Sequence, residues 1–410
     1  MNTTIKTQNN KNIILLIIVA SLGYFVDIYD LLIFSIVRQS SLLGIGIKPV
    51  EVMSKGIFII NIQMLGLLLG GILWGVLGDK LGRIKVLFGS ILIYSIANFA
   101  NAYVLDVNTY ALVRFIAGIG LAGELGAGIT LVTESMSKQN RGYGTTIVAV
   151  IGLLGAAAAV FVAKYGWQRA YIVGGCLGIL LLLLRLGTFE STMFKNIEQN
   201  EVSKGNFFML FTNLKRFKKY IFCILIGAPL WYVVGILVTL SPEFGKALHA
   251  VQPLNAGDGI FYTYIGIAVG GIFAGLLAQL TKSRKITMLT FLLLSVITVI
   301  AYLKAQGLNS TYFAWLCFFM GCAVGYWSTF VTIAAEQFGT NIRSTVATTV
   351  PNFVRGSLIP ISILFKELSK WKGMIISGYI LMALLTILAL FALSQLDETF
   401  NKDLDYVEDI

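Results

Sequence analysis

The sequence is poor in charged residues for its length. Asp, Glu, Lys and Arg make up only 12% of the 410 residues, whereas 57% are hydrophobic. A soluble domain carries about a quarter charged residues, so a soluble fold of this size is excluded. Apolar runs of roughly 20 residues recur along the chain, and that length crosses a ~30 Å hydrocarbon layer at about 1.5 Å per residue. The composition indicates a polytopic membrane protein.

Residues that build metal centres and disulfides are also scarce. The single histidine, His249, falls in a predicted loop, which leaves no His cluster for a metal. The four cysteines lie inside apolar runs without a C-x-x-C pair, and we expect them to be small core residues. The sequence also has no ATP-binding loop of the G-x4-G-K-(S/T) type. We therefore expect no metal, no cofactor and no primary pumping.

The excess of basic residues has a membrane explanation. A net charge of +11 would suggest a nucleic-acid partner in a soluble chain, but Lys and Arg accumulate at the cytoplasmic face of membrane proteins. With both termini inside, 19 of the 31 Lys and Arg fall in inner segments, 10 in outer segments and two, Arg114 and Arg355, within spans. The first residues lack a cleavage site, so the first run should stay as a helix. We expect a multi-pass protein of the cell inner membrane with both termini cytoplasmic and no nucleic-acid partner.

The apolar runs fall into two groups of six. The first group covers 13–37, 57–77, 86–104, 110–134, 143–163 and 169–187, and the second covers 220–240, 259–280, 286–304, 311–335, 345–365 and 374–394. We predict an all-α membrane protein of twelve transmembrane helices in two pseudo-symmetric bundles. Its parts are a bundle at 1–190, a cytoplasmic connector at 191–219, a second bundle at 220–396 and a cytoplasmic tail at 397–410.

An internal repeat supports two related halves. Glu134 and Arg141 follow the fourth run, and Glu336 and Arg343 follow the tenth with the same spacing, 202 residues later. Matches at equivalent places in two halves are the mark of a duplicated unit.

A short motif between the second and third runs carries a family resemblance. Its residues Gly75, Asp79, Gly82, Arg83 and Lys85 have the spacing G-x-x-x-D-(R/K)-x-G-R-x-(R/K). This resembles the signature loop of the major facilitator superfamily, whose members are transporters with two six-helix halves that rock about a central site.

Two further elements fit the same family. Arg114, Gly118, Gly120 and Gly123 resemble its R-x-x-x-G-x-G-x-x-G element, and Tyr24 to Asp30 resemble the first helix of metabolite:proton symporters and sugar porters. The resemblance implies the major facilitator fold and a secondary transporter, and it leaves the substrate open.

The resemblance also implies a conformational latch. In family members the acid at the position of Asp79 lies at the N-terminus of helix eleven and holds the halves in the outward-open state, which suits a carboxylate at a helix N-terminus. We assign to the latch the signature residues and the repeated pairs: Gly75, Asp79, Gly82, Arg83, Lys85, Glu134, Arg141, Glu336 and Arg343. Ordinary cytoplasmic loop charge is the alternative.

Three ionisable residues in the spans suggest proton coupling. Charges inside a membrane span are costly and mark function, and Asp27 and Asp30 share one face of the first helix, three residues apart. We predict that Asp30 accepts the proton, that Arg114 is its ionic partner and that Asp27 is a second acceptor. A static ion pair that fixes helix register is the alternative.

Two more charges fall near the midplane, one from each half. Counting 1.5 Å per residue, Glu124 and Arg355 reach about the same depth, where transporters bind substrates between halves. The arginine fork suits a carboxylate or phosphate, so we predict that Arg355 and Asn352 hold an anionic or polar metabolite near Glu124. Alternatively, Glu124 and Arg355 pair with each other and the substrate is a neutral sugar.

Central aromatic residues are further candidates for the substrate site, because sugars stack on such rings. We include Trp231, Tyr232, Tyr262 and Trp327, although most membrane aromatics serve packing.

These features together predict a secondary transporter rather than an enzyme. The preferred hypothesis is proton-coupled symport of an organic anion, sugar acid or sugar by a monomer in the lipid bilayer. The alternatives are a facilitative uniporter or exchanger, and a sensor on a transporter fold.

Overall fold

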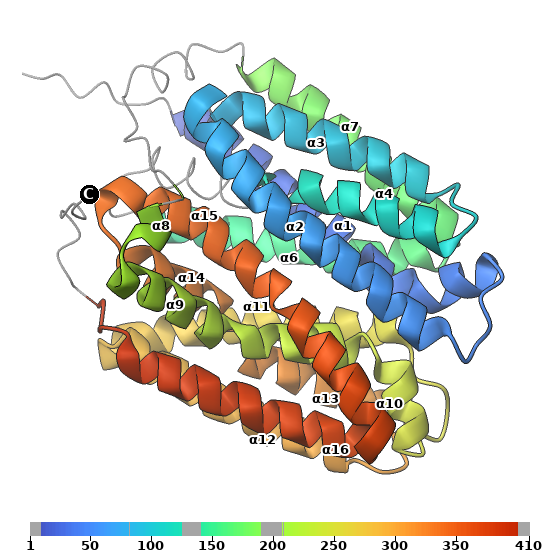
Figure 1. Cartoon of the computed structure of the whole chain (residues 1–410). Helices are drawn as coiled ribbons and strands as arrows, with labels where there is room; N and C mark the ends of the chain where they lie inside the picture. The colour runs from blue at the N-terminus through green and yellow to red at the C-terminus, as the bar shows by residue number, and fades with distance from the viewer. Residues whose placement is uncertain (1–9, 82, 125–140, 190–206, 208, 401–410) are drawn as a thin grey trace, which may run out of the picture.

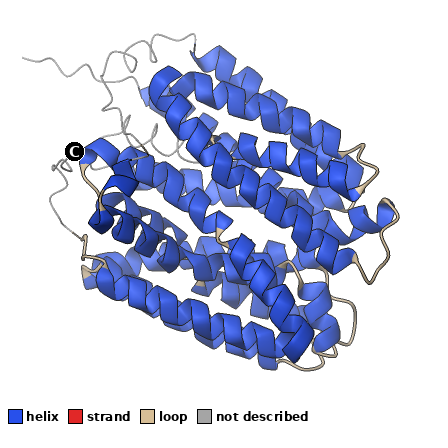
Figure 2. Cartoon of the chain, in the orientation of Figure 1, coloured by secondary structure: helices blue, strands red, loops and turns tan. Residues whose placement is uncertain are grey.

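A computed structural model describes residues 10–81, 83–124, 141–189, 207 and 209–400 of the chain. Side chains are described throughout these ranges except at 10–13, 76, 78–81, 83–85, 141–146, 187–189, 340–341 and 343–344. Figure 2 shows that the described part consists of helices and connecting loops, without a strand. The predicted all-α class is confirmed.

The first half contains six long helices in the described residues. They are α1 (Asn10–Gly44), α2 (Val52–Leu81), α3 (Arg83–Asn101), α4 (Val107–Leu121), α6 (Arg141–Ala163) and α7 (Trp167–Phe189). Asp106 begins α4 as its N-cap, since its carboxylate accepts from the backbone N–H groups of Asn108 and Thr109.

The second half repeats this plan with more interrupted helices. Its elements are α8 (Met209–Thr212), α9 (Leu214–Tyr232), the π-helix η1 (Val233–Val238), α10 (Ser241–Ala247), α11 (Ala256–Thr281), α12 (Arg284–Lys304), α13 (Ser310–Ala323), α14 (Trp327–Glu336), α15 (Thr340–Gly356) and α16 (Leu358–Gln395). Helix α9 begins at Leu214, inside the stretch predicted as the connector. Helix α16 turns back at Gly373, whose φ of 75° suits glycine, so it forms two crossings.

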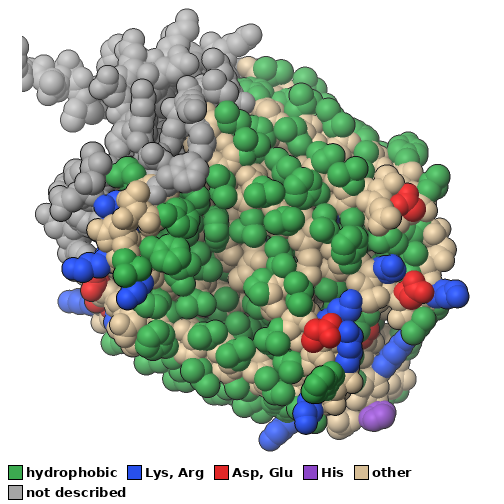
Figure 3. Space-filling model, viewed as in Figure 1, with side chains coloured by type: hydrophobic (Ala, Val, Ile, Leu, Met, Phe, Trp, Pro, Cys, Tyr) green, Lys and Arg blue, Asp and Glu red, His purple; other side chains and the backbone are tan. Residues whose placement is uncertain are grey.

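The helices are long and apolar enough to cross a bilayer. Among the described residues, eight apolar segments meet this criterion and one of them contains the reversal at Gly373. Three shorter apolar helices bring the number of crossings to twelve. Figure 3 shows a broad band of hydrophobic side chains, with the visible charged residues gathered toward two opposite ends. This is the surface of a multi-pass membrane protein, because lipid tails exclude charge.

Figure 1 shows the first half lying alongside the second, with α15 and α2 adjacent at their contact. We call the end at which α16 finishes the tail end. We call the opposite end, where α1 finishes and α16 reverses, the far end.

Glycines allow equivalent helix pairs of the two halves to pack backbone against backbone. A Cβ on Gly66 of α2 would lie 2.2 Å from the Phe115 carbonyl oxygen of α4. A Cβ on Gly266 of α11 would lie 2.1 Å from the Phe318 carbonyl oxygen of α13. Small residues permit such close approach in membrane helices, so the pseudo-symmetry extends to the packing.

The helices α4 and α13, of the fourth and tenth crossings, end at matching places. Helix α4 ends at Leu121, before a turn at Ala122 and Gly123, and α13 ends at Ala323, before a turn that includes Gly325. Gly123 and Gly325 are separated by the same 202 residues as the repeat found in the sequence. Such a break releases backbone carbonyls from intrahelical bonds, and one of them contributes to the site below.

Candidate substrate and proton site between the halves

A buried ion pair joins the two halves in the middle of the molecule. Arg355 of α15 donates from Nη2 to Oδ2 of Asp27, the central residue of α1, at 3.2 Å. Neither residue is more than 1% exposed. Among the described residues, Oδ1 of Asp27 and Nε of Arg355 have no hydrogen-bond partner. Because buried charges need full hydrogen bonding, this pair retains one acceptor and one donor that no described group uses.

Asn352 connects this pair to the break in α4. Its Oδ1 accepts from Nη1 of Arg355 at 3.5 Å, and its Nδ2 donates at 3.2 Å to the carbonyl oxygen of Ala122, the C-cap of α4. Asn352 is fully buried and lies one helical turn before Arg355. The carbonyl released by the helix break therefore holds the residue that orients the arginine. We call Asp27, Asn352 and Arg355 the central cluster.

The predicted ion pair between Asp30 and Arg114 is not formed. Arg114 donates at 2.9 Å to the backbone carbonyl oxygen of Asp30 and at 3.3 Å to Oε1 of Gln63. No described group meets hydrogen-bonding geometry with the Asp30 carboxylate, and the amide of Asn98 is the polar group that lies close to it. The reason is geometric: the carboxylate faces α3 and α7, where Asn98 and Gly174 lie, while Arg114 approaches from α4.

Glu124 was predicted to lie beside the substrate or to pair with Arg355, but its partner is another residue. Its carboxylate accepts both ends of the Arg185 guanidinium from α7, one of them at 3.0 Å from Nη1 to Oε2. Both residues are 2% exposed, and Gly23 of α1 packs directly against them. The predicted pairing of Glu124 with Arg355 is wrong, because Arg185 of the same half already neutralises Glu124.

The four aromatic candidates separate into two pairs. Trp327 contacts the hydroxyl of Tyr24 from the other half, and Trp231 is 4% exposed with an Nε1 that no described residue accepts. Tyr232 and Tyr262 are placed elsewhere. The Tyr232 hydroxyl donates to the Gly378 carbonyl oxygen at 2.7 Å inside the second half, and Tyr262 is 38% exposed on the outer surface. Helix packing and lipid contact, respectively, account for those two residues.

A second ion pair between the halves lies at the far end. Both terminal nitrogens of Arg38 on α1 donate at 2.7 Å to Glu243 of α10, and Nη2 also donates to the Thr239 carbonyl oxygen at 3.2 Å. Arg38 is 1% exposed, and Gly56 of α2 leaves room for its side chain. The sequence did not single out Arg38 or Arg185, because their acidic partners are distant in sequence.

The two halves and their matching glycine packing agree with the family resemblance found in the sequence. A model described as Major Facilitator Superfamily matches residues 13–362. The chain belongs to this superfamily. It is therefore a membrane transporter and not an enzyme, as predicted.

Curated relatives and a solved structure agree with membership of the superfamily. A protein of Haemophilus influenzae described as a metabolite transport protein is 26% identical over 350 residues, which cover 82% of this chain and 84% of the relative. The 3-(3-hydroxy-phenyl)propionate transporter of Escherichia coli is 28% identical over 299 residues, covering 70% and 71%. The proton:xylose symporter XylE bound to 6-bromo-6-deoxy-D-glucose matches with a TM-score of 0.70 over 97% of this chain and 98% of that chain. At 17% identity this last likeness shows the fold alone.

Most of the predicted latch residues, or their side chains, lie outside the part of the chain that the structure describes. Gly82 and Glu134 lie outside the described residues, as do the side chains of Asp79, Arg83, Lys85, Arg141 and Arg343. Gly75 is described, and a Cβ there would meet no described atom within 4 Å. Glu336 is described and accepts from Nη2 of Arg284 at 2.8 Å, at the tail end of the second half.

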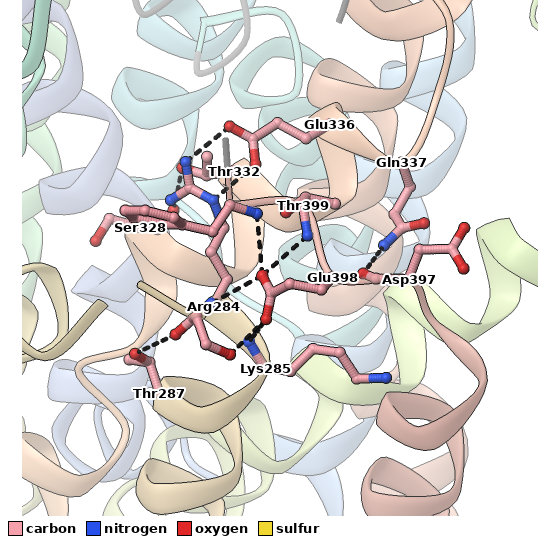
Figure 4. Close-up of polar contacts among 12 residues, drawn as sticks. Arg284, Lys285, Thr287, Ser328, Thr332, Glu336, Gln337, Asp397, Glu398 and Thr399 are labelled. Carbon is pink, nitrogen blue, oxygen red and sulfur yellow. Dashed lines mark hydrogen bonds and ion pairs between the residues drawn. The ribbon is translucent and has the colours of Figure 1, made fainter. Parts of the chain in front are cut away.

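Figure 4 shows the cluster around this contact. The Glu398 carboxylate accepts from the backbone N–H groups of Arg284 and Lys285, at 3.0 and 3.2 Å, and so caps α12 from a distant segment. Burial disfavours the charged form, but hydrogen bonds from Ser283 and from these backbone groups outweigh it and lower the pKa of Glu398 to about 2. This acid tethers the end of α16 to the start of α12.

Proposed function

We propose that this transporter carries a small carboxylate together with a proton. The observation that carries the proposal is the buried Asp27–Arg355 pair between the halves, with one unpartnered oxygen and one unpartnered nitrogen among the described atoms. The name of one relative adds support, because 3-(3-hydroxy-phenyl)propionate is itself a carboxylate. The sugar cargo named for the structural neighbour does not bear on substrate, because the likeness there extends only to the fold.

The chemistry of the two side chains explains coupling. An arginine keeps its proton in a protein, whereas an aspartate can take one up. When a proton neutralises Asp27, Arg355 loses its partner in a site that is cut off from water. A substrate carboxylate then replaces Asp27 and accepts the planar guanidinium through two parallel hydrogen bonds. The proton and the anion therefore favour each other's binding, which is positive coupling between two ligands.

We assign first uptake of the proton to Asp30. It lies three residues after Asp27 on the same helix face, about 5–6 Å away between Cβ atoms. Gln63 and the Asp30 carbonyl hold Arg114 away from the carboxylate. The carboxylate is thus free to bind a proton and transfer it one helical turn to Asp27.

Alternating access supplies the transport step. The Arg38–Glu243 pair ties the halves together at the far end, which we take to be the outside, with both termini in the cytoplasm of a bacterial inner membrane. The signature residues around Asp79 and the pairs Glu134–Arg141 and Glu336–Arg343 would hold the other state. One chain contributes both sides of the central cluster, so a monomer suffices.

A thermal-shift screen of purified protein tests the substrate class. The panel contains benzoate, 3-phenylpropionate, nicotinate and sialic acid, with benzyl alcohol, nicotinamide and xylose as neutral counterparts. A ligand at about 100 times its dissociation constant should stabilise the protein by about 2.7 kcal/mol. We expect a carboxylate to stabilise the wild type and its neutral counterpart to have no effect.

Variants at the arginine complete this test. Arg355→Gln and Arg355→Lys should both lose the response, the second because an ammonium lacks the bidentate fork. Arg169→Gln, at an exposed position, is the matched control and should respond like the wild type. A stabilising carboxylate whose effect survives Arg355→Gln would contradict the assignment.

Proton coupling is tested by uptake into cells or proteoliposomes with the carboxylate that the screen identifies. We expect accumulation against a gradient that collapses with a protonophore. Asp30→Asn should abolish accumulation but retain exchange of labelled for unlabelled substrate. Accumulation that survives Asp30→Asn would show that Asp30 does not accept the proton.

One observation favours a second candidate, a facilitator or exchanger for a neutral sugar. Arg355 already has an anionic partner within the chain, so the central cluster can remain neutral without an anionic substrate. Stabilisation by xylose rather than by any carboxylate, with uptake insensitive to a protonophore, would favour this candidate.

A further inference from the structure

A second group of buried polar atoms lies inside the first half, away from the contact between the halves. Asn98 of α3 is fully buried and Asp30 of α1 is 1% exposed. By strict geometry, both carboxylate oxygens of Asp30 and both amide atoms of Asn98 lack a hydrogen-bond partner within the described chain, although the Asn98 amide lies close enough to the carboxylate to interact with it. Buried polar groups are almost always hydrogen-bonded to protein or to ordered water, so these four atoms together indicate bound water.

Gly174 of α7 places the carboxylate and the amide side by side. A Cβ at this glycine would lie 2.6 Å from Oδ1 of Asp30 and 3.3 Å from Nδ2 of Asn98. Both groups therefore face the same point on α7, and a larger residue there would displace the carboxylate. The glycine therefore lets α1, α3 and α7 come close together at this point.

The polar atoms continue toward the far end of the molecule. Asn101, the last residue of α3, is fully buried, and neither of its amide atoms has a partner in the described chain. It lies one helical turn beyond Asn98 and so on the same face. Tyr103, two residues further, is 73% exposed. The line from Tyr103 to Asp30 thus runs from the surface into the interior of the first half.

The charged and titratable groups around Asp30 favour a proton over a metal ion. Arg114 faces Asp30 from α4, with an Nη1 that lacks a partner among described residues, and Tyr171 faces it from α7. Tyr29 and Asp27 are neighbours on α1 itself. Sodium needs several oxygen ligands, and the positive charge of Arg114, which donates to the backbone carbonyl of Asp30, would repel it. Water bound between two amides and a carboxylate has the two to four partners that a buried water requires.

We propose that Asn101, Asn98 and Asp30 hold a chain of water molecules that brings the proton into the first half from the far end. This inference rests on the proposed function of Asp30 as the proton acceptor. It separates the two cargoes in space: the substrate moves between the halves, whereas the proton enters through one half. The amides bind and order the water, and Asp30 takes up the proton.

A hydroxyl chain in the same half is the competing route. The hydroxyls of Tyr110 and Tyr171 lie 2.6 Å apart, and the Tyr110 hydroxyl donates to Oγ of Ser41 at 3.2 Å. Hydroxyls can also conduct protons, and Tyr171 lies below Arg114 with the guanidinium carbon 5.7 Å from its ring centre. These hydroxyls already satisfy one another, whereas the Asp30 carboxylate and the two asparagines do not. Bound water is therefore required to complete the hydrogen bonds of the asparagine route, whereas the hydroxyl chain is complete without it.

Infrared spectroscopy tests the route without any substrate. The full-length protein, reconstituted in lipid, is transferred from H2O to D2O at a pH where Asp30 is protonated. The carbonyl stretching band of the protonated Asp30 carboxyl group is identified by its absence in Asp30→Asn. The rate at which this band shifts on deuteration is then measured. Asn98→Leu and Asn101→Leu should each slow this shift by about tenfold, equivalent to about 1.4 kcal/mol on the barrier. Asn108→Leu, at an exposed asparagine of the same end, is the control and should exchange like the wild type.

The outcomes are distinct. Slowing in Asn101→Leu with normal exchange in Tyr171→Phe supports the proposal, and the reverse pattern overturns it in favour of the hydroxyl chain. Sodium-dependent movement of the Asp30 band also overturns it. If Asn98→Leu fails to fold, Asn101→Leu and Gly174→Ala give the same test, because Gly174→Ala displaces the carboxylate itself. Because no substrate is used, a failed carboxylate screen leaves this result intact, and the absence of an Asp30 band would contradict both roles of Asp30.

Discussion

At the scale of single residues, the arginines of the membrane interior differ in what they are paired with. Arg185 meets Glu124 within one half, and Arg355 meets Asp27 across the two halves. Breaking a buried pair leaves an uncompensated charge and costs about 3–5 kcal/mol. A pair within one half can hold structure without interruption, whereas a pair across the halves must exchange partners when the halves move.

This difference predicts how variants of the Arg185–Glu124 pair behave. Arg185→Met should lower the free energy of unfolding by about 3–5 kcal/mol, and the double variant Arg185→Met, Glu124→Leu should recover much of that loss. Chemical denaturation in detergent measures both. Arg169→Met, an exposed arginine, is the control and should stay within about 0.5 kcal/mol of the wild type. A double variant no more stable than Arg185→Met would contradict a structural ion pair.

At the scale of secondary-structure elements, glycine determines how closely α2 and α4 pack. Gly66→Ala should destabilise the protein by about 1–3 kcal/mol, because its Cβ would press on the Phe115 carbonyl oxygen and force the helices apart. Gly275→Ala is the control in α11, where an added Cβ meets no described atom within 4 Å. That change should be neutral or slightly stabilising, since alanine is the better helix former. Equal losses in the two variants would show that helix propensity dominates.

The cap of α12 gives a prediction with a defined pH dependence. The pKa of Glu398 is lowered to about 2 from an ordinary value of 4.5. The stability that its charged form contributes is therefore complete above the ordinary value and is lost as the pH falls toward 2. Glu398→Gln should reduce stability at pH 7 by about 1 kcal/mol, the usual worth of a cap. The gap in melting temperature should narrow below about pH 4.5, and a constant gap down to pH 3 would contradict the assignment.

The elements themselves could be predicted from sequence, because twelve apolar runs and two polar ends follow directly from the cost of placing charge in lipid. The pairing of the charges could not. Asp27 and Arg355 were each chosen as functional, yet their contact depends on how α1 and α15 turn toward each other, which hydropathy does not encode. Asn98 and Asn101 were missed altogether, although asparagines within an apolar run are the kind of signal that could have identified them.

At the scale of the whole molecule, the Arg38–Glu243 contact predicts a gate at the far end. In a chain lacking its four native cysteines, Arg38→Cys with Glu243→Cys should react with a short bifunctional maleimide and lose transport. Each single cysteine variant, treated in the same way, controls for the loss of the ion pair. Transport that continues after complete crosslinking would show that the halves do not separate there.

The account depends most directly on Asp27 releasing Arg355 when the substrate binds. Proton uptake on adding the identified carboxylate to weakly buffered, purified protein measures that release. We predict about one proton taken up per substrate bound, an affinity that falls as the pH rises, and no uptake with pH-independent affinity in Asp27→Asn. Binding of the carboxylate by the wild type without any proton uptake would contradict the account.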